Sequence, residues 1–151
     1  MNRKLILNLV FPTTIIIFTL FSKWWIADVV DGTDGIMYGF PFIYKSPAFY
    51  TSMAEEYFIT ELIADFLIYF GVIVGIIYLI NKHLFKIKIR KIITVFLYTI
   101  ALILLSLEIL LAFMPENKFS IKRDFDIVIK QTGFEFPFNQ NDSKEFDNYH
   151  R

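Results

Sequence analysis

Three long apolar runs constrain this chain more than any other feature. They cover residues 5–22, 58–80 and 92–114, they hold no lysine or arginine, and Glu61, Asp65 and Glu108 are their only acidic residues. A helix of about 20 apolar residues spans the ~30 Å hydrocarbon core of a bilayer. Hydrophobic residues make up 56% of the 151 residues, more than a soluble core of this size needs. We therefore predict an all-α membrane fold with three transmembrane helices at these positions.

The first run could also be read as a cleaved signal peptide, because Arg3 and Lys4 precede it. No small-x-small cleavage pattern follows it, and Trp24 and Trp25 stand at its end. Tryptophan rings settle at the membrane interface, so we expect an uncleaved anchor. Pro12 inside the run removes one backbone donor and predicts a kink.

The orientation follows from the basic residues, which are retained on the cytoplasmic side during insertion. The loop 81–91 contains Lys82, Lys86, Lys88, Arg90 and Lys91 and no acid, whereas the loop 23–57 is mainly acidic. We expect a multi-pass protein of the bacterial inner membrane with a cytoplasmic N-terminus. Residues 1–114 would form the membrane domain, with 23–57 as an outer loop and 81–91 as an inner loop, and residues 115–151 an outer C-terminal tail.

The outer loop and the tail both show local structure. Asp31-Gly32 and Asp34-Gly35 predict turns, and the four aromatic rings of residues 38–44 are expected to pack on the outer ends of the helices or at the interface. In the tail, apolar and polar residues alternate around 119–121 and 125–129, and residues 131–133 resemble a turn. These patterns predict a short β-hairpin in the tail.

The segment Tyr38-Gly39-Phe40-Pro41-Phe42 follows the Asp/Gly turns and precedes an aromatic apolar run that contains Asp65. This order of features resembles that of small bacterial integral membrane proteins. The resemblance covers the outer loop and the start of the second run, and it implies a membrane protein without implying any activity.

Asp65 and Glu108 are the carboxylates that the sequence places within the membrane. The second helix runs inward and the third outward, so both lie roughly 8 to 10 Å below the outer interface and are expected to be neighbours, with Tyr98 among the candidate hydrogen-bond donors. Two interpretations stay open. The carboxyl groups either connect helices as structural groups or form a proton or cation site. Glu61, one turn from Asp65, is expected near the headgroups.

Small residues predict where helices approach each other. Gly71 and Gly75 form a GxxxG element in the second run, and Ala101 lies on the polar and small face of the third. Glycines spaced by four residues let a neighbouring helix come close. These positions are therefore predicted to pack against another helix, in this chain or in a partner.

Catalysis is not expected. The chain has no cysteine, which excludes disulfides and thiolate chemistry, and it has no phosphate-binding loop, HExxH element or nucleophile elbow. We expect no cofactor, no metal site and no nucleic-acid partner. The leading hypothesis is a non-catalytic membrane protein that associates with itself or with other membrane subunits. The alternative is a proton- or cation-conducting oligomer that uses the intramembrane carboxylates.

The basic inner loop generates a topology prediction. A reporter fused after Arg151 should be found outside the cytoplasm, and one inserted near Lys86 should be found inside. Alkaline phosphatase and green fluorescent protein fusions measure the two sides. If both positions report the same side, one of the three predicted spans is wrong.

Overall fold

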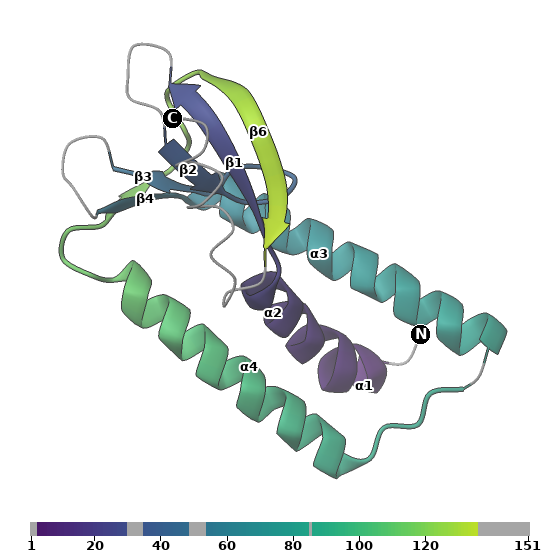
Figure 1. Cartoon of the computed structure of the whole chain (residues 1–151). Helices are drawn as coiled ribbons and strands as arrows, with labels where there is room; N and C mark the ends of the chain where they lie inside the picture. The colour runs from purple at the N-terminus through teal and green to yellow at the C-terminus, as the bar shows by residue number, and fades with distance from the viewer. Residues whose placement is uncertain (1–2, 30–34, 49–53, 85, 136–151) are drawn as a thin grey trace. The chain divides into compact units, whose positions relative to one another are not determined.

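The structure, a computed structural model, describes residues 3–29, 35–48, 54–84 and 86–135. In these residues the chain forms three long apolar helices and a six-stranded mixed sheet (Figure 1). The predicted all-α fold is therefore wrong, and the fold combines helices with a sheet. Four of the six strands have only three or four residues each, and two of the pairings join segments far apart in sequence, so local patterns did not reveal the sheet.

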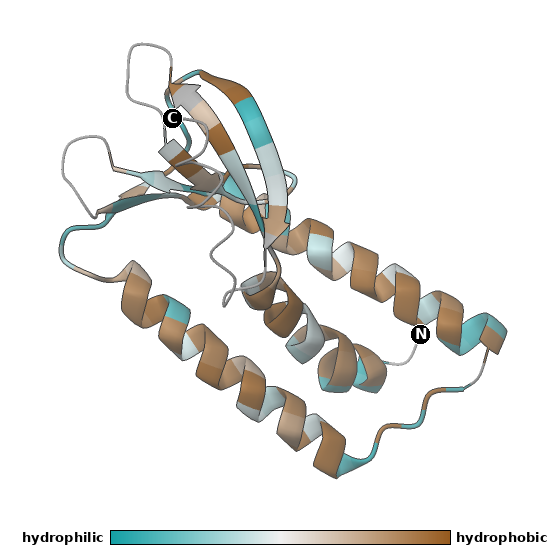
Figure 2. Ribbon diagram, viewed as in Figure 1, coloured by the Kyte–Doolittle hydropathy of each residue, from teal (hydrophilic) through white to brown (hydrophobic). Residues whose placement is uncertain are grey.

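Each apolar run forms a helix, with boundaries within about two residues of those predicted, except that the second helix continues to Leu84, past the predicted end at residue 80. The first helix comprises α1 (Arg3–Leu5), the π-helical η1 (Ile6–Val10) and α2 (Phe11–Leu20). The second comprises α3 (Ile59–Leu79) and the π-helical η2 (Ile80–Leu84), and the third is α4 (Lys91–Ala112). All three are long and apolar enough to cross a membrane, and Figure 2 shows hydrophobic residues along most of α3 and α4.

The chain divides into two compact units. The first contains Met1–Thr19 and Phe66–Leu111, and the second contains Leu20–Asp65 and Ala112–Arg151. Helix α3 contributes to both, because its residues up to Asp65 belong to the second unit.

The first unit has a small apolar core between the first helix and α3. Leu5 and Val10 are buried with Ile73 and Ile77 of α3. Nearer the other end of these helices, Phe18 makes edge-to-face contacts with the rings of Phe66 and Tyr69. Aromatic pairs of this geometry add attraction beyond the area they bury. The first helix and α3 are thus in contact through their apolar side chains.

Pro12 is accommodated by the π-helical turn that precedes it. The Phe11 N–H bonds to the Ile6 carbonyl, five residues back, and in this register residue 12 would bond to the Leu7 carbonyl. Pro12 has no N–H to donate. The hydroxyl of Tyr98 on α4 donates to the Leu7 oxygen instead, at 2.8 Å. A hydrogen bond between helices therefore replaces the one that the proline removes.

The second unit is built around the sheet, whose strand order is β5-β4-β3-β2-β1-β6. Its strands are β1 (Ser22–Val29), β2 (Gly35–Tyr38), β3 (Lys45–Pro47), β4 (Glu55–Phe58), β5 (Lys118–Ser120) and β6 (Ile127–Glu135). All neighbours are antiparallel except β4 and β5. Ala27, Val29, Met37 and Ile43 form its buried cluster.

The predicted hairpin in the tail is wrong, although both tail segments contain strands. β5 pairs with β4 at one edge of the sheet and β6 pairs with β1 at the other. Residues 131–133, which were expected to turn, continue β6 opposite Ile26, Trp25 and Trp24. The glycine in this segment serves packing, because a Cβ on Gly133 would collide with the ring of Trp24.

The bond from Tyr98 to the Leu7 carbonyl generates a stability prediction. Tyr98→Phe should lower the free energy of unfolding by about 1 kcal/mol, because the Leu7 carbonyl loses its donor. Tyr78→Phe is the matched control, since the Tyr78 side chain is exposed on α3. Both variants can be compared by reversible unfolding in mixed micelles. Equal stability of Tyr98→Phe and the wild type would contradict this role of the hydroxyl.

Candidate functional site

Asp65 is fully buried, and both of its carboxylate oxygens accept hydrogen bonds from backbone amides. Oδ2 accepts the Phe40 N–H at 2.8 Å and Oδ1 accepts the Phe42 N–H at 3.0 Å. The two amides flank Pro41, which has no N–H of its own. Asp65 on α3 therefore binds a short irregular segment, residues 39–42, which we call the aromatic loop.

The aromatic loop is also fixed to β1. The Gly39 N–H donates to the Lys23 carbonyl at 2.9 Å, and the Trp25 indole N–H donates to the Gly39 carbonyl at 2.8 Å. Gly39 has φ of 140°, and a Cβ at this position would collide with the Phe42 carbonyl, so only glycine fits. The Phe40–Pro41 peptide bond is cis. Four hydrogen bonds thus place the loop between β1 and the start of α3.

The ammonium group of Lys23 lies among aromatic rings beside this loop. Its Nζ is 3.8 Å from the ring centroid of Trp25, 5.1 Å from that of Phe40 and 5.4 Å from that of Phe134. Phe134 in turn stacks on Phe21 with a centroid separation of 5.1 Å. A cation is attracted to the faces of aromatic rings at such distances. Strands β1 and β6 therefore surround one side of the aromatic loop with rings and a positive charge.

Glu61, one helical turn before Asp65, has a different environment. Its Oε1 accepts the Arg123 N–H at 3.4 Å, a long contact, and its Oε2 is buried and has no hydrogen-bond partner among the described residues. The two carboxylates share one face of α3, as their spacing predicts. Glu61 contacts the tail, whereas Asp65 contacts the aromatic loop.

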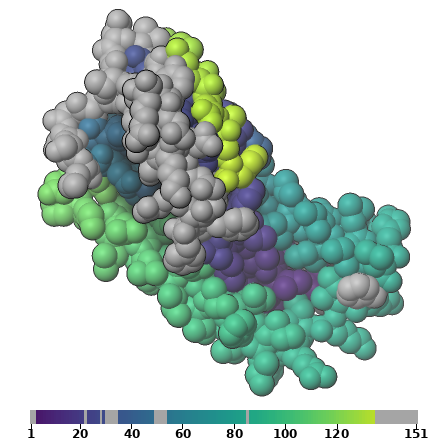
Figure 3. Space-filling model, in the orientation of Figure 1, coloured from purple at the N-terminus to yellow at the C-terminus, as the bar shows by residue number. Residues whose placement is uncertain are grey.

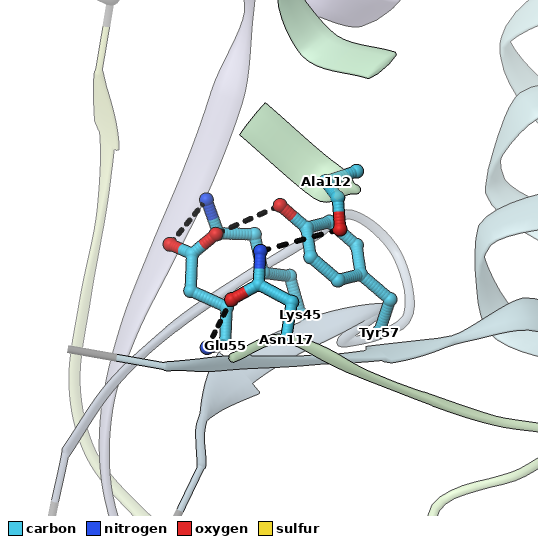
Figure 4. A network of polar contacts seen from close by, with 5 residues as sticks. All are labelled: Lys45, Glu55, Tyr57, Ala112 and Asn117. Carbon is cyan, nitrogen blue, oxygen red and sulfur yellow. Dashed lines mark hydrogen bonds and ion pairs between the residues drawn. The ribbon is translucent and has the colours of Figure 1, made fainter. Parts of the chain in front are cut away.

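A second polar network joins the tail to the sheet (Figure 4). Glu55 forms an ion pair with Lys45 at 2.6 Å and accepts the Tyr57 hydroxyl at 2.7 Å. The Asn117 side chain accepts the Glu55 N–H at 2.8 Å and donates to the Ala112 carbonyl at 3.3 Å. This network connects the end of α4 to β3 and β4, and its charges neutralise one another, which indicates a structural role.

The buried carboxylate of Glu56 adds a further link at the same edge. It lies 3.2 Å from the ammonium of Lys118 and accepts a hydrogen bond from the Ser120 hydroxyl. Both partners belong to β5, and the ring of Phe119 between them stacks on Tyr57. These side-chain contacts add to the backbone pairing of the short parallel strand β5 with β4.

The remaining predicted residues lie elsewhere. Glu108 lies on the exposed surface of α4, in the first unit, whereas Asp65 belongs to the second. Tyr98, expected as a donor to the carboxylates, donates to the Leu7 carbonyl. Ala101 is the buried residue of α4, and a Cβ at Gly71 or Gly75 would meet no atom within 4 Å in the described part of the chain, apart from the backbone of its own helix.

Sequence reasoning missed the amides of Phe40 and Phe42 as partners of Asp65. The sequence did contain an indication of this contact. An irregular segment with proline and bulky apolar residues needs acceptors for its backbone N–H groups. The acidic residue in the nearest apolar run can provide these acceptors. Among the residues that the structure describes, no group of three His, Cys, Asp or Glu could hold a metal ion.

Comparisons with models of protein families, with curated proteins and with solved structures found no match to this chain.

The geometry of Asp65 generates a prediction about its substitution by asparagine. Asp65→Asn keeps one acceptor oxygen but turns an NH₂ group toward the second amide, so the free energy of unfolding should fall by about 1–3 kcal/mol. Glu61→Gln is the matched control, because Glu61 accepts only one long bond. Unfolding in mixed micelles measures both. An Asp65→Asn variant as stable as Glu61→Gln would show that the two amides do not require a carboxylate.

Proposed function

We propose that this chain is a non-catalytic integral membrane protein that acts by association within the membrane, either with copies of itself or as a small subunit of a larger assembly. It would cross the inner membrane three times with its N-terminus in the cytoplasm. The lipid bilayer and other membrane helices are its partners in this proposal. The observation that carries it is the uncovered glycine face of α3.

Gly71 and Gly75 lie on the side of α3 away from its buried residues. Ile73 and Ile77 face the first helix, whereas the space beside both glycines is open. Glycine destabilises a helix by about 1 kcal/mol relative to alanine. Among the residues that the structure describes, that cost is not offset by close packing, so the benefit of the two glycines is expected from a helix of another chain.

The exposed apolar side chains of helix α4 also support the proposed association. Ala101 is 1% exposed, while large apolar residues on the rest of the helix are exposed, including Ile92, Phe96 and Leu110. Figure 3 shows side chains of α4 at the surface over much of its length. Such a surface suits lipid and neighbouring helices, and it is too apolar for water.

The pairing of strands in the sheet supports the proposed number of membrane crossings. β1 lies in the connection between the first helix and α3, whereas β6 lies in the tail, and the two strands pair along their length. Paired strands must be on the same side of a membrane. Two crossings, by α3 and α4, would return the chain to that side, and the basic loop between them favours the outside for it.

The alternative function, proton or cation conduction through Asp65 and Glu108, has less support. Both Asp65 oxygens are engaged by loop amides. Each carboxylate oxygen already accepts one backbone N–H, which favours a structural role for Asp65.

Association through the glycine face predicts the effect of a bulky substitution. Gly75→Leu should reduce the oligomer or its co-purifying partners several-fold and leave the fold of the chain intact, since the new side chain meets open space. Ile76→Phe, on a different face and already exposed, is the matched control. Native mass spectrometry of the purified protein measures the assembly. An unchanged mass distribution in Gly75→Leu would remove this face from the proposal.

A further inference from the structure

The aromatic loop exposes two phenylalanine rings although it is firmly fixed. Phe40 is 38% exposed and Phe42 is 50% exposed. Ile63, two residues before Asp65 on α3, is 51% exposed. An apolar surface of this kind is costly in water and favourable against lipid.

The attachment of the loop to α3 sets its depth. The apolar part of the second helix ends at Ile80, before Asn81 and Lys82. About 20 residues counted back from Ile80 reach Glu61, which puts Asp65 roughly 6 Å inside the hydrocarbon boundary. Phe40 and Phe42 are hydrogen-bonded to Asp65, so their backbone lies near the same level.

Irregular backbone at this level needs internal hydrogen-bond partners, because lipid supplies none. Asp65 meets this requirement for Phe40 and Phe42, and the Lys23 carbonyl meets it for Gly39. The Lys23 ammonium lies over the Trp25 and Phe40 rings, an arrangement suited to the headgroup region, where lysine and tryptophan are both favoured.

We propose that the aromatic loop is a re-entrant lipid anchor, which inserts the Phe40 and Phe42 rings into the outer leaflet at the boundary between headgroups and acyl chains. The occupant of this surface is phospholipid. The proposal rests on the proposed membrane insertion of α3 and adds a contact that the three helices do not require.

The absence of cysteine from the chain makes a direct test possible. Phe42→Cys carries a single nitroxide spin label after reconstitution in vesicles of phosphatidylcholine and phosphatidylglycerol. Leu67→Cys on α3 is the lipid-facing reference and Val128→Cys on β6 is the water-facing reference, since both side chains are more than half exposed, at 59% and 51%. Collision rates with oxygen and with a water-soluble nickel chelate are measured at each site.

The label at residue 42 should resemble that at residue 67, with an oxygen-to-nickel ratio several-fold above that at residue 128. A ratio at residue 42 equal to that at residue 128, with residue 67 still in lipid, overturns the lipid anchor and leaves the membrane protein intact. A water-like ratio at residue 67 overturns both proposals.

A second variant tests how the loop is held. In the Phe42→Cys background, Asp65→Asn should shift the label at residue 42 toward the water-like ratio, while Glu61→Gln should leave it unchanged. A label that remains lipid-like in Asp65→Asn overturns the part of the proposal that assigns the loop position to this carboxylate.

Discussion

Backbone amides that lack water must find acceptors inside the protein, and much of the second unit depends on how Asp65 meets this demand. One side chain accepts both amides of a segment that contains proline and two phenylalanines. The same segment bonds to β1 through Gly39. Asp65 therefore connects the apolar helix α3 to the sheet by accepting two backbone amides of the aromatic loop.

The sheet joins two parts of the chain that are separated by two helices. β1 to β4 come from the connection before α3, and β5 and β6 come from the tail after α4. Each tail strand adds to a different edge, so the sheet is complete only after α4 has been made. The network of Lys45, Glu55, Tyr57 and Asn117 then attaches the start of the tail to strands formed much earlier in the sequence (Figure 4).

The sequence predicted the helices well and the sheet poorly, for physical reasons. Long apolar runs encode their own secondary structure, because backbone hydrogen bonds in a helix are local. Strands of three or four residues carry little pattern, and their partners are distant. Trp24 and Trp25 illustrate the difficulty. As a pair after an apolar run they indicate an interface, but on β1 Trp24 is buried against Gly133 while Trp25 bonds to the aromatic loop.

The same limits applied to the candidate site. The position of Asp65 in an apolar run predicted that this residue is structurally or functionally important. The same position predicted that its side chain is excluded from water. Its partners could not be predicted, because backbone amides have no signature in a sequence. Side-chain reasoning therefore favoured Glu108 and Tyr98, the visible polar groups of the neighbouring run. Tyr98 instead satisfies a carbonyl left free by Pro12, which is again a backbone group.

Asp65 and Tyr98 indicate a common role for polar side chains of the apolar helices, which is to form hydrogen bonds with backbone groups. Asp65 accepts from amides that have no other partner, and Tyr98 donates to a carbonyl that lost its partner to proline. If Asp65 were protonated, one of its oxygens would become a donor facing an N–H group, so proton binding and attachment of the aromatic loop would oppose each other. A carboxylate that conducts protons must gain and lose a proton repeatedly. A carboxylate that holds a loop by accepting hydrogen bonds must keep one protonation state. The geometry at Asp65 therefore favours the second role.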